Sequence, residues 1–454
     1  MFLLHKNLRL AFMTRDKTLS SKILLAALLF ALAGTLFSCS PNRFLHKKAS
    51  AYLLNDSSFK GAHIGISVYD PSTRKYLYNH DGDKYFIPAS NTKLFTCYAA
   101  MKYLGDSILA ALYQENDDEV LLQATGDPTF LHPDFKRQPL MDYLKQDRIT
   151  GVELYTPFAS EPLGRGWAWD DYAEEYMAER DPFPMYGNIA TFVFEGDSVH
   201  AVPQLLNQAI VGIPSAGQPW NISRNPGGHF FSVLNGQGTI APRKTITLAM
   251  EKGAFASRYL ADTIHKKVVR RTEALAEDGL KPLFSQPTDS LLSIMMHRSD
   301  NFFAEQTLLM VSQNRLGRMD DRKVIDTLLK TDYAGLPQSP KWMDGSGLSR
   351  YNLFTPQDFI WLLNKMKDDF GMERVKNILP TGGEGTLSSL YQAYNGRIYA
   401  KTGTLSNHVA LSGIIFTRKN RPLIFSVLVN NQQVPASSIR RGIERLITSI
   451  IERY

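Results

Sequence analysis

Residues 88–101 have the sequence PASNTKLFTCYAAM. A helix is expected to begin at Ser90, because the residues that follow are apolar at helical spacing: Leu94, Cys97, Tyr98 and Met101. Residues three apart lie on one helix face, so Lys93 can reach Ser90. A serine hydroxyl needs a nearby base to take its proton, and a lysine becomes such a base when burial or a second cation lowers its pKa. This stretch therefore predicts a Ser-Lys nucleophile pair at the start of a helix.

Two further motifs follow downstream, Ser299-Asp300-Asn301 and Lys401-Thr402-Gly403. Each motif is weak alone, since Ser57-x-x-Lys60 and Ser72-x-x-Lys75 match the first motif by chance. Context separates them, because Ser72 falls in a predicted hairpin turn and Ser57 precedes the first predicted strand. The fixed order and the local structure together favour a catalytic site.

Each motif residue has a chemical role and a plainer alternative. Lys401 can supply the second cation, Ser299 can relay a proton to a leaving nitrogen, and Asn301 can hold a substrate amide. Backbone N–H groups at the helix start can stabilise an oxyanion. Alternatively, Ser90 and Ser299-Asp300-Asn301 are only helix caps, and Lys401 is a solvated strand residue.

The two ends of the chain are expected to pair in one sheet. A hairpin is predicted at residues 64–78, and three strands are predicted at 398–404, 409–417 and 423–430, before a C-terminal amphipathic helix. We expect a catalytic domain formed by residues 62–104 and 251–454. Residues 105–250 differ in their pattern, with alternating runs typical of strands, and are expected to form an inserted accessory domain.

The N-terminus indicates export. A basic stretch precedes fifteen mostly apolar residues, 23–37, a length typical of a signal peptide. We expect a lipoprotein signal peptide at residues 1–38, lipidation of Cys39 and a tether at 39–61; the alternative is an ordinary cleaved signal. The other cysteine, Cys97, is predicted to be a buried core residue.

The charge distribution argues against a nucleic-acid partner. The formal net charge is +7, but five basic residues and one acidic residue fall within residues 1–38, which leaves only +3 for the remainder. The sequence contains no basic run. It also lacks metal and phosphate-loop motifs, so we expect no metal and no cofactor.

The motifs resemble those of the class C low-molecular-mass penicillin-binding proteins of peptidase family S13, the D-alanyl-D-alanine carboxypeptidase/endopeptidases. Further matches to this family are Gly126-Asp127-Pro128-Thr129, 166–171, Asp344-Gly345-Ser346-Gly347-Leu348-Ser349 and Lys401-Thr402-Gly403-Thr404-Leu405. The resemblance implies an α/β (α+β) fold: a penicillin-binding/β-lactamase-like transpeptidase domain, with an antiparallel sheet flanked by helices and a large β-rich insertion.

The resemblance also implies residue roles. Ser90 would be the nucleophile and Lys93 the base, with Ser299 and Asn301 as proton relay and substrate anchor. Lys401 and Thr402 would bind the substrate carboxylate on the strand that carries Gly403 and Thr404, and the N–H groups of Ser90 and Thr404 would form the oxyanion hole.

We therefore expect a serine D-alanyl-D-alanine carboxypeptidase, endopeptidase or both, which acts on peptidoglycan stem peptides and is acylated by β-lactams. It would be anchored by lipid and face the periplasm, and Ser40 after Cys39 favours the outer membrane. The alternatives are a β-lactamase or a non-catalytic peptidoglycan-binding envelope lipoprotein.

Overall fold

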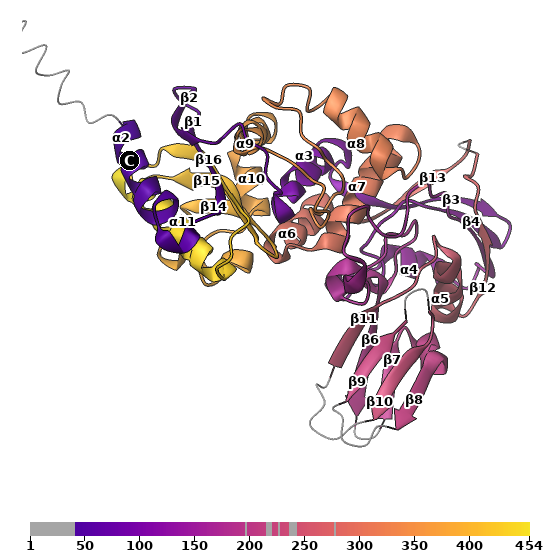
Figure 1. The fold of residues 1–454 in the computed structure, drawn as a ribbon. Coiled ribbons are helices and arrows are strands. Elements are labelled where there is room, and N and C mark those ends of the chain that lie inside the picture. Colours follow the sequence, from indigo (N-terminus) through magenta and orange to yellow (C-terminus); the bar gives the residue numbers. More distant parts are fainter. Residues whose placement is uncertain (1–40, 196–197, 215–219, 226–227, 236–242, 277) are drawn as a thin grey trace, which may run out of the picture.

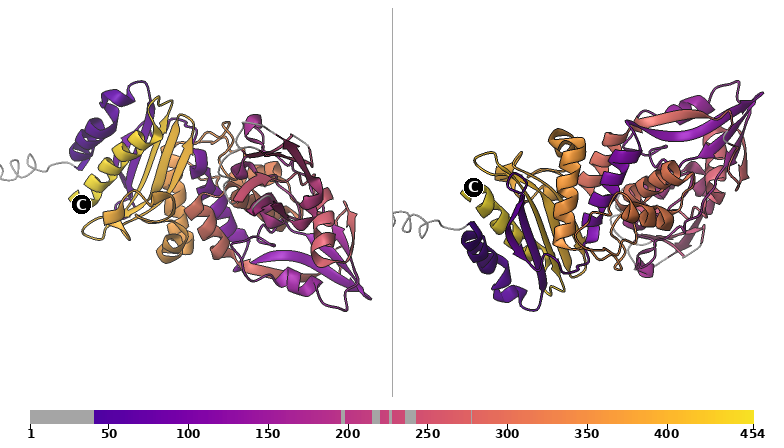
Figure 2. Two further views of the ribbon diagram at one scale, coloured as in Figure 1. Left: turned by 90° about the horizontal axis from the view of Figure 1, so that it is seen from below. Right: turned by 90° about the horizontal axis from the view of Figure 1, so that it is seen from above.

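The computed structural model describes residues 41–195, 198–214, 220–225, 228–235, 243–276 and 278–454. The expected signal peptide and Cys39 lie outside these residues. Figure 1 shows two parts, a helix-covered sheet built from both ends of the chain and a strand-rich part built from its middle. The two views of Figure 2 place these parts at opposite ends of an elongated molecule.

The first part contains an antiparallel sheet in the order β14-β15-β16-β1-β2. Strand β1 pairs with β16, with Ser67 opposite Ser426, so the two ends of the chain meet as the sequence predicted. Strand β14 is an edge strand. The bounds are β1 His63–Asp70, β2 Lys75–His80, β14 Ile398–Leu405, β15 His408–Phe416 and β16 Pro422–Asn430.

Helices cover both faces of this sheet. On β15, Val409 and Leu411 pack in the same core as helix α11 (Ala436–Arg453), whereas Ala410 packs in a second core with helices α3 (Lys93–Tyr103) and α9 (Pro356–Phe370). Successive strand side chains point to opposite faces, and both faces are buried here. This burial explains why β15 and β16 are almost continuously apolar.

The segment before β1 packs against the C-terminal helix. Helix α2 (Pro41–Ala49) continues into a π-helical turn at Ser50–Leu54, and Leu45 and Leu53 are buried in the core that contains α11. The described residues of the segment 39–61, which was expected to be a tether with a short helix, are mostly helical and packed. No helix among the described residues is long and apolar enough to cross a membrane.

A helical layer lies between the sheet and the strand-rich part (Figure 1). Helix α3 is at its centre, and every residue of 93–101 is buried, including Cys97 as predicted. The surrounding helices are α6 Thr288–Arg298, α7 Asn301–Leu316, α8 Asp321–Lys330 and α10 Met372–Ile378. The turn between α6 and α7 carries the second motif.

The strand-rich part has a core of its own. It contains a five-stranded sheet in the order β12-β5-β4-β3-β13 and two three-stranded sheets in the orders β11-β6-β7 and β8-β10-β9. The five-stranded sheet consists of β3 Ser107–Asn116, β4 Glu119–Ala124, β5 Gly151–Tyr155, β12 Lys267–Arg271 and β13 Lys281–Pro287. The smaller sheets consist of β6 Ile189–Glu195, β7 Ser198–Val202, β8 Ile210–Pro214, β9 Asn221–Arg224, β10 Phe231–Asn235 and β11 Arg243–Thr247, with helices α4 Pro139–Leu144 and α5 Ala254–Ile264 alongside.

The return boundary differs from the expected position after residue 250. Strand β13 pairs with β3, and Tyr259 and Leu260 of α5 pack in the core of the strand-rich part. The helical pattern that resumes at Ala254 therefore belongs to the insertion. We propose that the inserted part extends from about residue 105 to Pro287.

Candidate active site

Ser90 lies in a 3-10 turn, Ala89–Thr92, that leads directly into α3. Ala89 has a φ of 49°, a left-handed conformation that is costly for a residue other than glycine. Gly347 packs against this turn so closely that a Cβ there would overlap the carbonyl oxygen of Ala89. The α-helix thus begins at Lys93 instead of Ser90. Ser90 itself lies in a strained turn against which Gly347 packs.

Lys93 is fully buried, and its side chain contacts its predicted partner Ser90 and two further groups. Its Nζ donates to Ser90 Oγ (3.0 Å), to Asn301 Oδ1 (2.6 Å) and to the carbonyl oxygen of Ser346 (2.7 Å). Burial lowers the pKa of Lys93 to about 8, against the opposing effect of nearby carboxylates. A lysine with this pKa is partly neutral near neutral pH and can accept the serine proton.

A second hydroxyl–ammonium pair lies between the α6–α7 turn and β14. Lys401 is fully buried, and its Nζ donates to Ser299 Oγ over 2.8 Å and to the carbonyl oxygen of Thr402 over 2.7 Å. Burial, and then repulsion from Lys93, lower the pKa of Lys401 well below its usual value. Asn91, the residue after Ser90, connects the nucleophile turn to β14, because its Nδ2 donates to the carbonyl oxygen of Lys401 over 3.0 Å.

Strand β14 approaches the nucleophile turn because it carries a glycine. A Cβ on Gly403 would lie 2.6 Å from the carbonyl oxygen of Pro88 and 3.0 Å from Asn91 Nδ2. Thr402 is half-buried, whereas Thr404 is exposed and its Oγ1 accepts a hydrogen bond from Arg440 (2.7 Å). Any larger residue at 403 would push this edge strand away from Ser90.

The predicted side chains therefore converge. Contacts link Ser90, Lys93 and Asn301 in one group and Ser299 with Lys401 in a second, and the Ser90 residue is only partly buried. Two ammonium groups from segments far apart in the sequence lie in one site. Such an arrangement can deprotonate a nucleophile and protonate a leaving group without a metal ion.

Sequence reasoning gave no role to a buried acid that supports this site. Glu305 is 1% exposed; its Oε1 accepts from the backbone N–H of Ser346 (2.7 Å), and its Oε2 lies 3.4 Å from Arg180 Nη1. Arg180 is itself 2% exposed and pairs with Asp321 over 2.8 Å. Burial raises the pKa of Glu305 to about 7. The available signal was its position four residues after Asn301, on the same helix face.

The described residues contain no group of three or more His, Cys, Asp or Glu side chains that could hold a metal ion.

Comparisons with known proteins point to one family. The sequence model of the D-Ala-D-Ala carboxypeptidase 3 (S13) family matches residues 45–197 and 237–450. The chain is 27% identical over 438 residues to a D-alanyl-D-alanine carboxypeptidase of Actinomadura sp. (strain R39), an alignment that covers 85% of this chain and 80% of that protein.

Solved structures share the fold. Penicillin binding protein 4 of Haemophilus influenzae superposes with a TM-score of 0.72 at 19% identity, covering 90% of this chain and 99% of that chain. A predatory peptidoglycan endopeptidase of Bdellovibrio bacteriovorus superposes with a TM-score of 0.51 at 15% identity, covering 86% and 93% of the two chains.

Proposed function

Because the chain belongs to the D-Ala-D-Ala carboxypeptidase 3 (S13) family, we propose that it cleaves the D-Ala-D-Ala bond of peptidoglycan stem peptides with Ser90 as its nucleophile. The observation that supports this assignment most directly is the pair of short contacts, Lys93 Nζ to Ser90 Oγ at 3.0 Å and Lys401 Nζ to Ser299 Oγ at 2.8 Å. The relative from Actinomadura, which is named for the same activity, also supports the proposal.

In the acylation step, Ser90 Oγ attacks the carbonyl carbon while its proton passes to neutral Lys93. The C–N bond then breaks as the proton taken up by Lys93 passes to the leaving nitrogen through the Ser299 hydroxyl, which Lys401 holds in place. The product is an ester on Ser90 and a free amine. Water attacks the ester in the second step and regenerates the serine.

Substrate binding is assigned to the edge of β14. Lys401 and Thr402 would attract the terminal carboxylate, and Asn301 would hold the adjacent amide. The N–H groups of Ser90 and Thr404 would receive the oxyanion, and Gly403 permits the close approach of this strand.

The same chemistry serves two further reactions. A β-lactam ring presents a strained amide to Ser90 and would form the same ester. Cleavage of a peptide cross-link differs only in its larger leaving group, so carboxypeptidase and endopeptidase activities share one site.

Placement in the envelope is part of the proposal. An exported chain lipidated at Cys39 would face peptidoglycan from a membrane anchor, and Ser40 favours the outer membrane. The helix α2, packed on α11, begins two residues after Cys39, so the catalytic domain would sit close to its anchor.

Fluorescent penicillin tests the assignment. Purified protein should become covalently labelled, and Ser90→Ala should remove the label while Ser58→Ala, an exposed serine away from the site, should retain it. Mass spectrometry of digested muropeptides should show loss of D-Ala with the wild type only. Label on the Ser90→Ala protein, or no label on folded wild type, would reject the proposal.

A further inference from the structure

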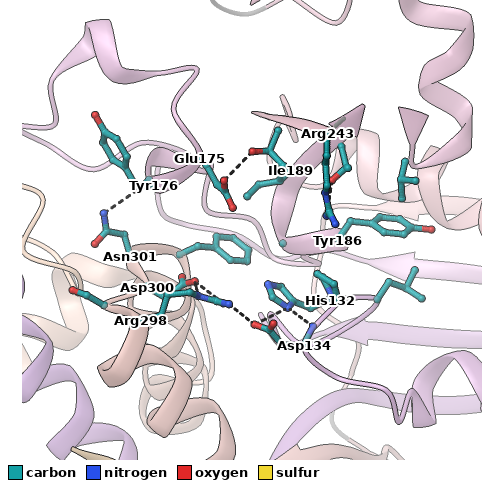
Figure 3. Close-up of a pocket in the computed structure, with 18 of the residues that line it drawn as sticks. His132, Asp134, Glu175, Tyr176, Tyr186, Ile189, Arg243, Arg298, Asp300 and Asn301 are labelled. Carbon is teal, nitrogen blue, oxygen red and sulfur yellow. Dashed lines mark hydrogen bonds and ion pairs between the residues drawn. The ribbon is translucent and has the colours of Figure 1, made fainter. Parts of the chain in front are cut away.

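A cavity of about 620 Å³ opens beside the turn between α6 and α7, which carries Ser299. Its wall includes Ser299 and Asn301, but not Ser90, Lys93 or Lys401. The opposite wall is a face of the small sheet β11-β6-β7 in the inserted part. Figure 3 shows Glu175, Ile189 and Arg243 on one side and His132, Asp134 and Arg298 on the other. This volume is in the range of ordinary ligand pockets.

The sheet face that lines the cavity carries alternate side chains of β6. On β6, Ile189, Thr191 and Val193 face the cavity and are half-buried, while the intervening Ala190 and Phe192 are buried in the core of the inserted part. This alternation fixes which side chains can meet a ligand. The cavity floor is therefore mainly aliphatic and rests on a packed sheet.

The rim carries two charged groups without an ionic partner among the described residues. Arg243 Nη2 donates to Thr191 Oγ1 (3.3 Å), and Glu175 Oε2 accepts from Thr245 Oγ1 (2.8 Å). Across the cavity, by contrast, Arg298 pairs with both Asp134 and Asp300. The side of the cavity that contains β6, β7 and β11 thus offers one cation and one anion to a ligand, whereas Arg298 across the cavity is already paired with two aspartates.

The cavity lies on the side of the site from which the leaving group would depart, because Ser299 is part of its wall. Ser299 delivers the proton to the leaving nitrogen in the proposed mechanism, so the chain attached to that nitrogen departs past Ser299. Close to Ser299, Asn301 Nδ2 donates to the carbonyl oxygen of Tyr176 (2.9 Å). This hydrogen bond connects the α6–α7 turn to the inserted part at the cavity wall. A single D-Ala would leave this space largely unfilled.

We propose that this cavity binds the departing strand of a cross-linked substrate, that is, a second stem peptide whose side-chain amine is the leaving group. The inference rests on the proposed function. The C–N bond between the acyl D-Ala and that amine breaks, Ser90 keeps the acyl group, and the amine leaves protonated into the cavity. Aliphatic residues would contact the peptide stem, and Arg243 and Glu175 would pair with its free carboxylate and ammonium groups.

The test compares a cross-linked muropeptide dimer with a monomeric pentapeptide. Val193→Trp fills the cavity and should lower the ratio of kcat/KM for dimer over pentapeptide at least about tenfold. Val211→Trp, at an exposed strand position outside the cavity, is the matched control and should leave the ratio unchanged. Arg243→Ala is a second variant that does not depend on repacking, and it should lower the same ratio severalfold.

The outcomes separate this proposal from the proposed function. An unchanged dimer-to-pentapeptide ratio in both folded variants, with normal penicillin labelling, overturns the cavity assignment alone. A wild-type protein that is not labelled at Ser90 overturns the proposed function itself.

Discussion

The carboxylate of Glu305 accepts a hydrogen bond from the backbone N–H of Ser346 over 2.7 Å, and the carbonyl oxygen of Ser346 accepts one from Lys93 Nζ over the same distance. A buried acid on α7 is therefore one residue removed from the proposed catalytic base. Its charge also raises the pKa of Lys93 against the larger effect of burial. We propose that Glu305 positions Lys93 through Ser346.

Glu305→Gln should shift the pH profile of acylation. In the proposed mechanism neutral Lys93 is the active form, so the wild-type rate should rise with pH through the Lys93 pKa of about 8. Loss of the Glu305 charge lowers that pKa, so the rising limb should move to lower pH. Acylation by a β-lactam, measured from pH 6 to pH 10, checks the shift. Glu373→Gln, which removes an exposed carboxylate, is the control and should leave the rising limb of the pH profile in place. A rising limb that does not move in Glu305→Gln would contradict the role proposed for Glu305.

Lys401→Met should stabilise the protein while it abolishes acylation. The pKa of Lys401 is lower in the folded than in the unfolded state, so the unfolded state binds more protons between the two values. The free energy of unfolding of the wild type should therefore rise with pH across that window. The advantage of the variant, roughly 1–2 kcal/mol at neutral pH, should shrink toward pH 10.

Chemical denaturation at several pH values measures this effect. Lys419→Met, at an exposed turn, is the control and should show no such pH dependence. A variant that is less stable than the wild type at neutral pH would show that Lys401 contributes more through its contacts than it costs through burial.

Gly403→Ala should disable the site through sterics alone. The new methyl group would lie 2.6 Å from the carbonyl oxygen of Pro88, so β14 must move away from the nucleophile turn. A displacement of about 1 Å in such a site costs about a hundredfold in rate, and we expect at least that loss in the rate of β-lactam acylation. Near-normal acylation by a folded variant would mean that the turn yields and that the approach of β14 is not critical.

Local motifs made much of the site predictable. The Ser90–Lys93 spacing depends only on helical geometry, and Lys401 follows a strong turn signal on a predicted strand, so their chemistry could be assigned before the structure. The contacts of Glu305 could not be assigned, because its partners Arg180 and Ser346 come from distant segments that only the fold brings together.

Fold prediction was limited by the same dependence on distant contacts. That strands from both ends of the chain share one sheet could be predicted from their apolar patterns, although the specific pairing of β1 with β16 could not. The proposed return boundary differs from the expected one because α5 has the amphipathic pattern of any surface helix, and nothing local reveals which core it joins. The packing of α5 in the core of the strand-rich part and the pairing of β12 with β5 and of β13 with β3 support placing residues 254–287 in the inserted part.

Arg180→Met should destabilise the protein strongly. Arg180 is 2% exposed and neutralises the buried Glu305 and Asp321, so its removal leaves two uncompensated buried carboxylates. Breaking a buried pair in this way costs about 3–5 kcal/mol of unfolding free energy. Arg148→Met breaks an exposed Arg–Glu pair and should have almost no effect in the same denaturation series. Equal effects of the two variants would contradict the role of burial.

The penicilloyl adduct should be long-lived. Class A β-lactamases use a glutamate to activate the deacylating water. Among the described residues, however, no carboxylate forms a hydrogen bond with Ser90 or Lys93, and Glu305 is occupied by Ser346 and Arg180. Without such a base, water attacks the Ser90 ester slowly, so intact-protein mass spectrometry should detect the adduct long after free penicillin is removed. Rapid return of unmodified protein with turnover of penicillin would instead favour a β-lactamase, because only an activated water could release the ester that fast.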